Sequence, residues 1–191
     1  MPNKETNYIY CAYYWQTPSP TNADYYTTKA KGFLFGTAPM NGFGKQKPRT
    51  GEAYAGICIE EDYIEYIMVG LTDTLEKDKE YEIEFYISKA DFKKAYVKEF
   101  GVMFLDKPRR GYNKTGIPHK PPMDFYCEEG YRNSKEWVKI SGTYMAEGWE
   151  AAIILGYFNY DQPEGFKKKA HYYIDDVSIK PFTRVYNTKG N

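Results

Sequence analysis

The strongest constraint on the fold is an alternation of apolar and polar residues over the stretch Tyr81–Ser88. Every second residue from Tyr81 to Ile87 is aromatic or branched, whereas Glu82 and Glu84 lie between them. A period of two is typical of a β-strand that buries one face. Because such a face must be covered by another layer, the sequence predicts a packed β-sheet structure.

Six further stretches carry residues that favour strands. They are Ala53–Ile59, Tyr63–Leu71, Phe100–Leu105, Trp137–Tyr144, Ala151–Phe158 and His171–Phe182. Only the stretch Asp91–Phe100 has residues that favour a helix, and there one or two helical turns would lead directly into the next strand. We therefore predict an all-β protein, an antiparallel β-sandwich of the jelly-roll kind.

The length of 191 residues, with 42% hydrophobic residues, suits one domain with a real core. We expect residues 1–182 to form this single domain and residues 183–191 to form a C-terminal tail or linker.

Two long stretches, 17–51 and 107–135, are rich in proline and glycine and carry no strand pattern. Loops of this length in a compact domain are commonly functional. Both stretches also contain aromatic residues, so we expect them to pack along an edge or face of the sandwich. The candidate ligand-binding rings in and beside them are Trp15, Tyr25, Tyr26, Tyr112 and Tyr126. For each ring, packing in the core is the more frequent role.

Charge and cysteine content exclude several classes of partner. Lys plus Arg equals Asp plus Glu, at 26 each, so we expect no nucleic-acid partner. We also expect no membrane insertion, because no apolar run is long enough to span a bilayer. The start of the chain is polar, which indicates either a cytoplasmic protein or a trimmed mature fragment. Cys11, Cys58 and Cys127 allow one disulfide or three free thiols.

The sequence lacks the motifs of common enzymes, including nucleophile elbows, zinc-binding helices and phosphate loops. Acidic pairs such as Glu82 and Glu84 would suit a glycosidase, but they are more simply read as a solvated strand face. We therefore predict a protein that is not an enzyme.

The pair Asp175–Asp176 lies within an expected strand, where aspartate is uncommon. Alternation places Asp175 on the same face as the apolar Tyr173, Val177 and Ile179. A carboxylate in that position must be hydrogen-bonded, ion-paired or bound to a metal. Two explanations carry equal weight: a structural Ca²⁺ ion, or a carboxylate that fixes the backbone amides of a loop.

A series of motifs resembles one known family. In order they are TPSPTNADYY from Thr17, GEAYAGI from Gly51, KEYEIEFYISKAD from Lys79, WVKISGTYMAEGWE from Trp137, LGYF from Leu155 and YYIDDVSI from Tyr172. They resemble the extracytoplasmic jelly-roll domain found at the N-terminus of OmpA-like outer-membrane proteins of type IX-secreting Gram-negative bacteria. That domain is similar in fold to galactose-binding-like carbohydrate-binding modules.

The resemblance implies an extracytoplasmic location, at the outer membrane, the cell surface or in the periplasm, with a removed signal peptide. It implies a structural Ca²⁺ held by Asp175 or Asp176 and an N-terminal acidic residue, for which Glu52 is the candidate. It also implies glycan binding on exposed aromatic rings. The alternative is a protein-interaction or scaffold domain that binds an envelope protein of a secretion or gliding assembly.

Overall fold

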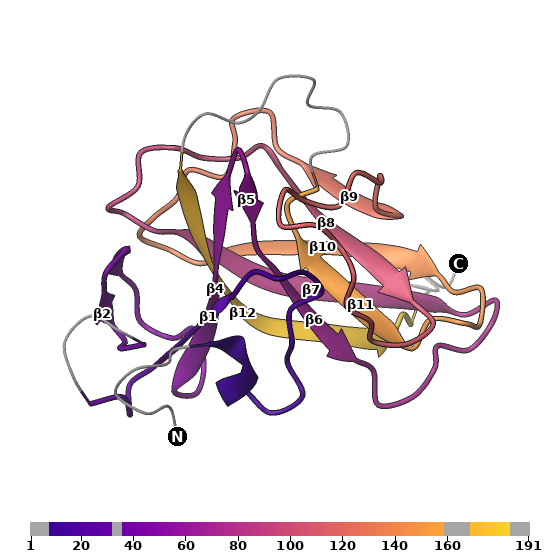
Figure 1. Cartoon of the computed structure of the whole chain (residues 1–191). Helices are drawn as coiled ribbons and strands as arrows, with labels where there is room; N and C mark the ends of the chain where they lie inside the picture. Colours follow the sequence, from indigo (N-terminus) through magenta and orange to yellow (C-terminus); the bar gives the residue numbers. More distant parts are fainter. Residues whose placement is uncertain (1–7, 32–35, 159–168, 184–191) are drawn as a thin grey trace, which may run out of the picture.

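The computed structural model describes residues 8–31, 36–158 and 169–183. Its main feature is a pair of antiparallel sheets packed face to face (Figure 1). The larger sheet has the order β1 (Asp24–Thr27), β4 (Ala53–Glu60), β12 (Ala170–Pro181), β7 (Glu80–Lys89) and β10 (Val138–Met145), with β5 (Tyr63–Ile64) paired to β4. The smaller sheet has the order β6 (Tyr66–Gly70), β11 (Ala152–Gly156), β8 (Glu99–Leu105) and β9 (Met123–Tyr126).

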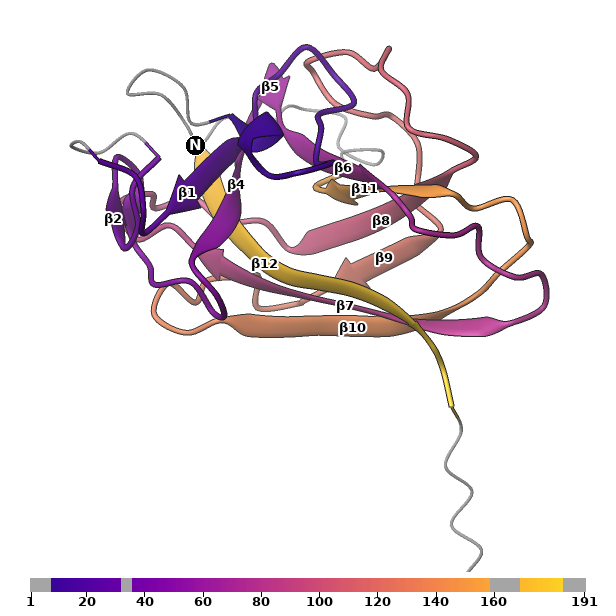
Figure 2. The same ribbon diagram turned by 90° about the horizontal axis from the view of Figure 1, so that it is seen from below.

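Figure 2 shows the two layers edge-on, with β12, β7 and β10 in one and β6, β11, β8 and β9 in the other. The chain crosses repeatedly between the layers, so that strands that follow one another in sequence often lie in different sheets. The expected all-β, antiparallel jelly-roll sandwich is confirmed. In the described part of the chain the helical structure is limited to the short 3-10 turn η1 (Ile9–Cys11), and the turns expected within Asp91–Phe100 do not form a helix.

The alternation in β7 sets the core. Tyr81, Ile83, Phe85 and Ile87 all face the second sheet and are at most 7% exposed. At an order of magnitude, burying each such side chain stabilises the fold by about 1.5–3 kcal/mol. No helix in the described residues is both long enough and apolar enough to cross a membrane.

The expected strand Tyr63–Leu71 is divided in two, because the chain changes sheets within it. β5 pairs with β4 in the larger sheet, whereas β6 pairs with β11 in the smaller one. Glu65 occupies the break between them. A continuous strand cannot belong to two packed sheets at once, so the alternation pattern alone does not reveal this division.

The two stretches expected to be irregular contain strands. The first holds β1 and the small hairpin of β2 (Met40–Asn41) and β3 (Gly44–Lys45), and the second holds β9. The hairpin lies beside the larger sheet at the end of β4 and β12 (Figure 2). The predicted tail 183–191 lies outside the described residues from 184 onward.

Candidate functional site

The segment from Tyr8 to Gln16 connects the edges of the two sheets. Tyr8 forms an antiparallel bridge with Asp24 of β1, the edge strand of the larger sheet. Gln16 forms another with Met68 of β6, the edge strand of the smaller sheet, through two hydrogen bonds of 2.8 Å. The segment is therefore fixed at both ends, and it lies across the side of the sandwich.

Two adjoining hollows lie at this side of the molecule, with volumes of about 250 and 660 Å³. Trp15 and Val177 line both hollows, so the two hollows meet at these side chains. We call them together the Trp15 cleft. The larger hollow falls within the range of about 300–1,000 Å³ that is typical of small-molecule sites.

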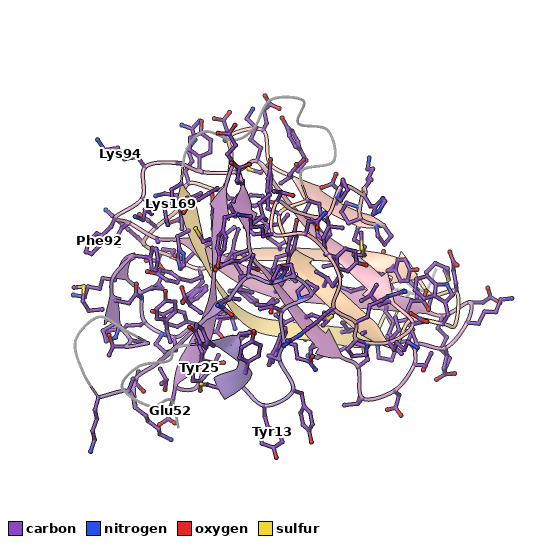
Figure 3. All side chains as sticks on the ribbon, viewed as in Figure 1. Tyr13, Tyr25, Glu52, Phe92, Lys94 and Lys169 are labelled. Atoms are coloured by element: carbon purple, nitrogen blue, oxygen red, sulfur yellow. The ribbon has the colours of Figure 1, made fainter. Side chains whose placement is uncertain are left out.

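The cleft exists because β12 loses one neighbour halfway along its length. From Tyr172 to Ile174 it pairs with both β4 and β7, but from Ser178 onward it pairs with β7 alone. Val177 and Ile179 therefore face the interior with part of their surface uncovered. Tyr25 of β1 lines the smaller hollow, and it is labelled in Figure 3.

The wall of the larger hollow includes five polar residues. Its polar residues come from the loop after β6 and from β12, and they are Thr72, Asp73, Thr74, Glu76 and Ser178. Aromatic rings can stack on the apolar face of a ligand ring. Hydroxyl and carboxylate groups beside them can hydrogen-bond the polar groups at the edge of that ligand ring.

A β-bulge changes the predicted alternation of β12 after Asp175. The register of β12 against β7 shifts between Asp175 and Ser178, and Asp176 has a φ of 49°. Asp175 lies on the outer face with Tyr173, as predicted, but the bulge turns Val177 and Ile179 to the inner face. An extra residue in a strand reverses the alternation after it, so the single apolar row predicted here is wrong.

The carboxylates of both bulge residues are bonded to one short loop. Asp175 accepts a hydrogen bond from the backbone amide of Arg49, and burial raises the pKa of Asp175. Asp176 binds the Arg49 guanidinium and the Thr50 hydroxyl, each at 2.5 Å. This is the second of the two predicted roles, in which a carboxylate fixes a loop.

Glu52 is exposed and pairs with Lys29, and it does not join the two aspartates. Among the described residues no group of three or more His, Cys, Asp or Glu side chains is arranged to hold a metal ion. Calcium binding by Asp175, Asp176 and Glu52 stays a prediction that the geometry of these residues does not support.

Tyr26 belongs to a second aromatic cluster, on the outer face of the larger sheet. It packs with Tyr54 and Tyr173 beneath the β2–β3 hairpin, and it is 1% exposed. Its hydroxyl donates a 2.7 Å hydrogen bond to Asp24. Adjacent residues of a strand face opposite sides, which is why Tyr25 lines the cleft and Tyr26 does not. The prediction that Tyr26 is an exposed platform is therefore wrong.

His171 is fully buried in this second cluster. The ring of Phe43, at the tip of the hairpin, stacks on the imidazole at 3.8 Å with an interplanar angle of 3°. Burial, with Lys169 and Lys93 nearby, lowers the pKa of His171 to about 3. His171 is therefore neutral at neutral pH, and its contact with Asp24 is not an ion pair.

Glu65 is a buried carboxyl group outside the set of site residues predicted from the sequence. It is 4% exposed and accepts a 2.6 Å hydrogen bond from the Cys58 amide. Burial first, and the negative charge of Asp24 second, raise the pKa of Glu65 to about 8. A signal was present in the sequence, since Glu65 interrupts an otherwise apolar strand.

The remaining candidate rings lie away from the cleft. Tyr112 is half-buried against the core, and Tyr126 of β9 is 60% exposed with its hydroxyl bonded to Glu128. Of the five predicted rings, the structure brings only Trp15 and Tyr25 together. Cys11, Cys58 and Cys127 are all free thiols, so the disulfide alternative does not hold.

The sequence matches no protein-family model and no curated protein. Several solved structures are similar in fold, among them carbohydrate-binding modules. The CBM22-1 xylan-binding domain from Paenibacillus barcinonensis Xyn10C has 16% identity and a TM-score of 0.49, over 90% of this chain and 87% of that one. A protein from Bacteroides thetaiotaomicron described as sugar-binding has 11% identity and a TM-score of 0.49, over 88% and 87%.

The N-terminal cellulose-binding domain of Cellulomonas fimi β-1,4-glucanase C has 10% identity and a TM-score of 0.41, over 69% of this chain and 80% of that one. These similarities are distant. The fold described above rests on the strand order and pairing of this chain itself.

Proposed function

We propose that the protein is a non-catalytic glycan-binding module and that the Trp15 cleft is its binding site. The observation that carries this proposal is the position of Trp15, which lines both hollows of one cleft, with Tyr25 in the smaller hollow and hydroxyl-bearing residues in the larger. A sugar ring has an apolar face that stacks on an aromatic ring and hydroxyl groups at its edge that need polar partners.

The arrangement of the cleft also supports binding without large rearrangement. The backbone that carries Trp15 is bridged to both sheets, and the opposite wall is part of β12. A site held in its binding conformation loses little conformational entropy when a ligand binds. The proposal places the module outside the cytoplasm, in the cell envelope, which is the location that the sequence resemblance implies.

Binding to soluble polysaccharides, measured by affinity gel electrophoresis and by calorimetry, tests the proposal. Xylan and hydroxyethyl cellulose are suitable first probes because xylan and cellulose are named for the similar structures, and mannan extends the panel. We expect at least one polymer to bind, and Trp15→Ala to weaken that binding tenfold or more, which corresponds to about 1.4 kcal/mol.

The matched control is Phe92→Ala. Phe92 is an aromatic residue, 58% exposed, that lines neither hollow, and Figure 3 shows it far from Tyr25. It should leave binding unchanged. If no glycan binds, or if Trp15→Ala has no more effect than Phe92→Ala, the proposal is wrong. Retention of a defined envelope protein instead of a glycan would favour the scaffold alternative.

A further inference from the structure

Two tyrosines next to the cleft are far more exposed than the other large hydrophobic side chains of the described chain. Tyr13 is 84% exposed and Tyr14 is 76% exposed. Figure 3 shows Tyr13 projecting away from the body of the molecule. Burial in the core therefore explains neither ring, and a protein gains no folding stability from leaving such surfaces in water.

The backbone at this point is strained. Tyr13 and Tyr14 are the middle residues of a turn that is closed by a 3.2 Å hydrogen bond from the Trp15 amide to the Ala12 carbonyl. Tyr14 has a φ of 69°. Turns with a positive φ at this third position favour glycine or asparagine there, because other side chains clash with the backbone. The chain instead holds a tyrosine in a position where it is unfavourable, and such strain is often found at functional sites.

The turn is joined directly to the cleft. Ala12 and Trp15, the two ends of the turn, both line the smaller hollow. The segment that carries the turn is bridged to β1 on one side and to β6 on the other. The two exposed rings are therefore held on a fixed support at the rim of the Trp15 cleft.

The relative orientation of the rings limits what they can bind. Their centroids are 4.8 Å apart, and their planes are nearly perpendicular, at 87°. Only one ring at a time can present its face to a flat partner, and the other braces it edge-on. The pair thus offers one stacking position, which suits one further sugar ring of a chain.

We propose that Tyr13 and Tyr14 form an outer subsite that stacks a sugar unit beyond the mouth of the Trp15 cleft, so that the protein binds a long polysaccharide chain more tightly than a short oligosaccharide. This inference rests on the proposed glycan-binding function. It distinguishes a polymer binder from a module that binds a short oligosaccharide, since a short ligand would be contained within the cleft.

The test compares polymers with short oligosaccharides of the same sugar. The pairs are xylan with xylotriose, hydroxyethyl cellulose with cellotriose, and mannan with mannotriose, each measured by calorimetry. The double variant Tyr13→Ala/Tyr14→Ala should bind the polymer about tenfold more weakly and the trisaccharide equally well. Trp15→Ala should weaken both, and Phe92→Ala should weaken neither.

A second variant separates binding from folding. Tyr14→Gly relieves the backbone strain, so its urea unfolding midpoint should be higher than that of the wild type while its polymer affinity is lower. Equal affinity of the double variant and the wild type for the polymer overturns the inference but leaves the proposed function intact. If the double variant loses affinity equally for the polymer and for the trisaccharide, the inference is overturned as well. A wild type that binds no glycan overturns both proposals.

Discussion

The buried carboxyl group of Glu65 should make the stability of the protein fall as pH rises from about 4.5 to about 8. In the folded state the pKa of Glu65 is about 8, against an ordinary value of 4.5. Between these values the folded state holds a proton that the unfolded state has released. The free energy of unfolding therefore decreases as pH rises through this window.

The size of the effect follows from the two pKa values. The full difference of 3.5 pH units, from 4.5 to about 8, corresponds to about 5 kcal/mol at about 1.4 kcal/mol per unit. His171 acts in the opposite sense, because its pKa is lowered from 6.5 to about 3 in the folded state. Below pH 6.5 the unfolded state binds a proton that the folded state does not, so the free energy of unfolding decreases as pH falls. From pH 6.5 to about 8 the Glu65 effect is unopposed by His171, and it amounts to about 2 kcal/mol.

The perturbation is Glu65→Gln, which keeps an oxygen that can accept the Cys58 amide but cannot titrate. Urea unfolding, followed by tryptophan fluorescence at several pH values, should show the wild type losing about 2 kcal/mol between pH 6.5 and 8. The variant should show no such loss. Glu76→Gln, at an exposed position, is the control and should retain the wild-type slope. A wild type of constant stability over this range, or a Glu65→Gln variant that keeps the slope, would refute the reasoning.

Three further predictions concern other buried groups. Phe43→Ala should uncover His171 and raise its pKa from about 3 toward 6.5, as measured by NMR titration of the imidazole; an unchanged value would show that Phe43 does not shield the ring. Glu150→Ala should lower the free energy of unfolding, measured with urea, by about 3 kcal/mol. The reason is that the fully buried carboxylate accepts hydrogen bonds from one hydroxyl and three backbone amides. A decrease of less than about 1 kcal/mol would contradict this prediction. Gly56→Ala should cost about 1–3 kcal/mol, because the added Cβ would lie 2.5 Å from the Tyr26 ring, and unchanged stability would show that the cluster can repack.

The sequence is most informative where a strand belongs to one sheet and has one buried face. In β7 each alternate residue from Tyr81 to Ile87 is buried as the pattern predicts. The pattern fails at two places for a local reason. At Glu65 the chain passes from one sheet to the other, and at Asp176 an extra residue reverses the faces of β12.

The candidate site could be predicted only in part. Trp15 and Tyr25 were candidates because they are aromatic residues near a long loop, and both line the cleft. Tyr26 has the same residue type and is its direct neighbour, yet it is buried on the opposite face. The hydroxyl-bearing wall comes from the loop after β6 and from β12, which are distant in sequence and meet only through the packing of the two sheets.

The most direct test of the glycan-binding proposal is the NMR response of the tryptophan indole groups to an added polysaccharide. The chain has three tryptophans. Trp15 lines the cleft, whereas the indole N–H of Trp137 donates to the Lys47 carbonyl and that of Trp149 donates to Glu147. With xylan, hydroxyethyl cellulose or mannan, we expect the Trp15 indole signal, assigned with Trp15→Phe, to shift while the other two stay in place. Shifts confined to Trp137 or Trp149, or no shift with any of the three polymers, would contradict the proposed site.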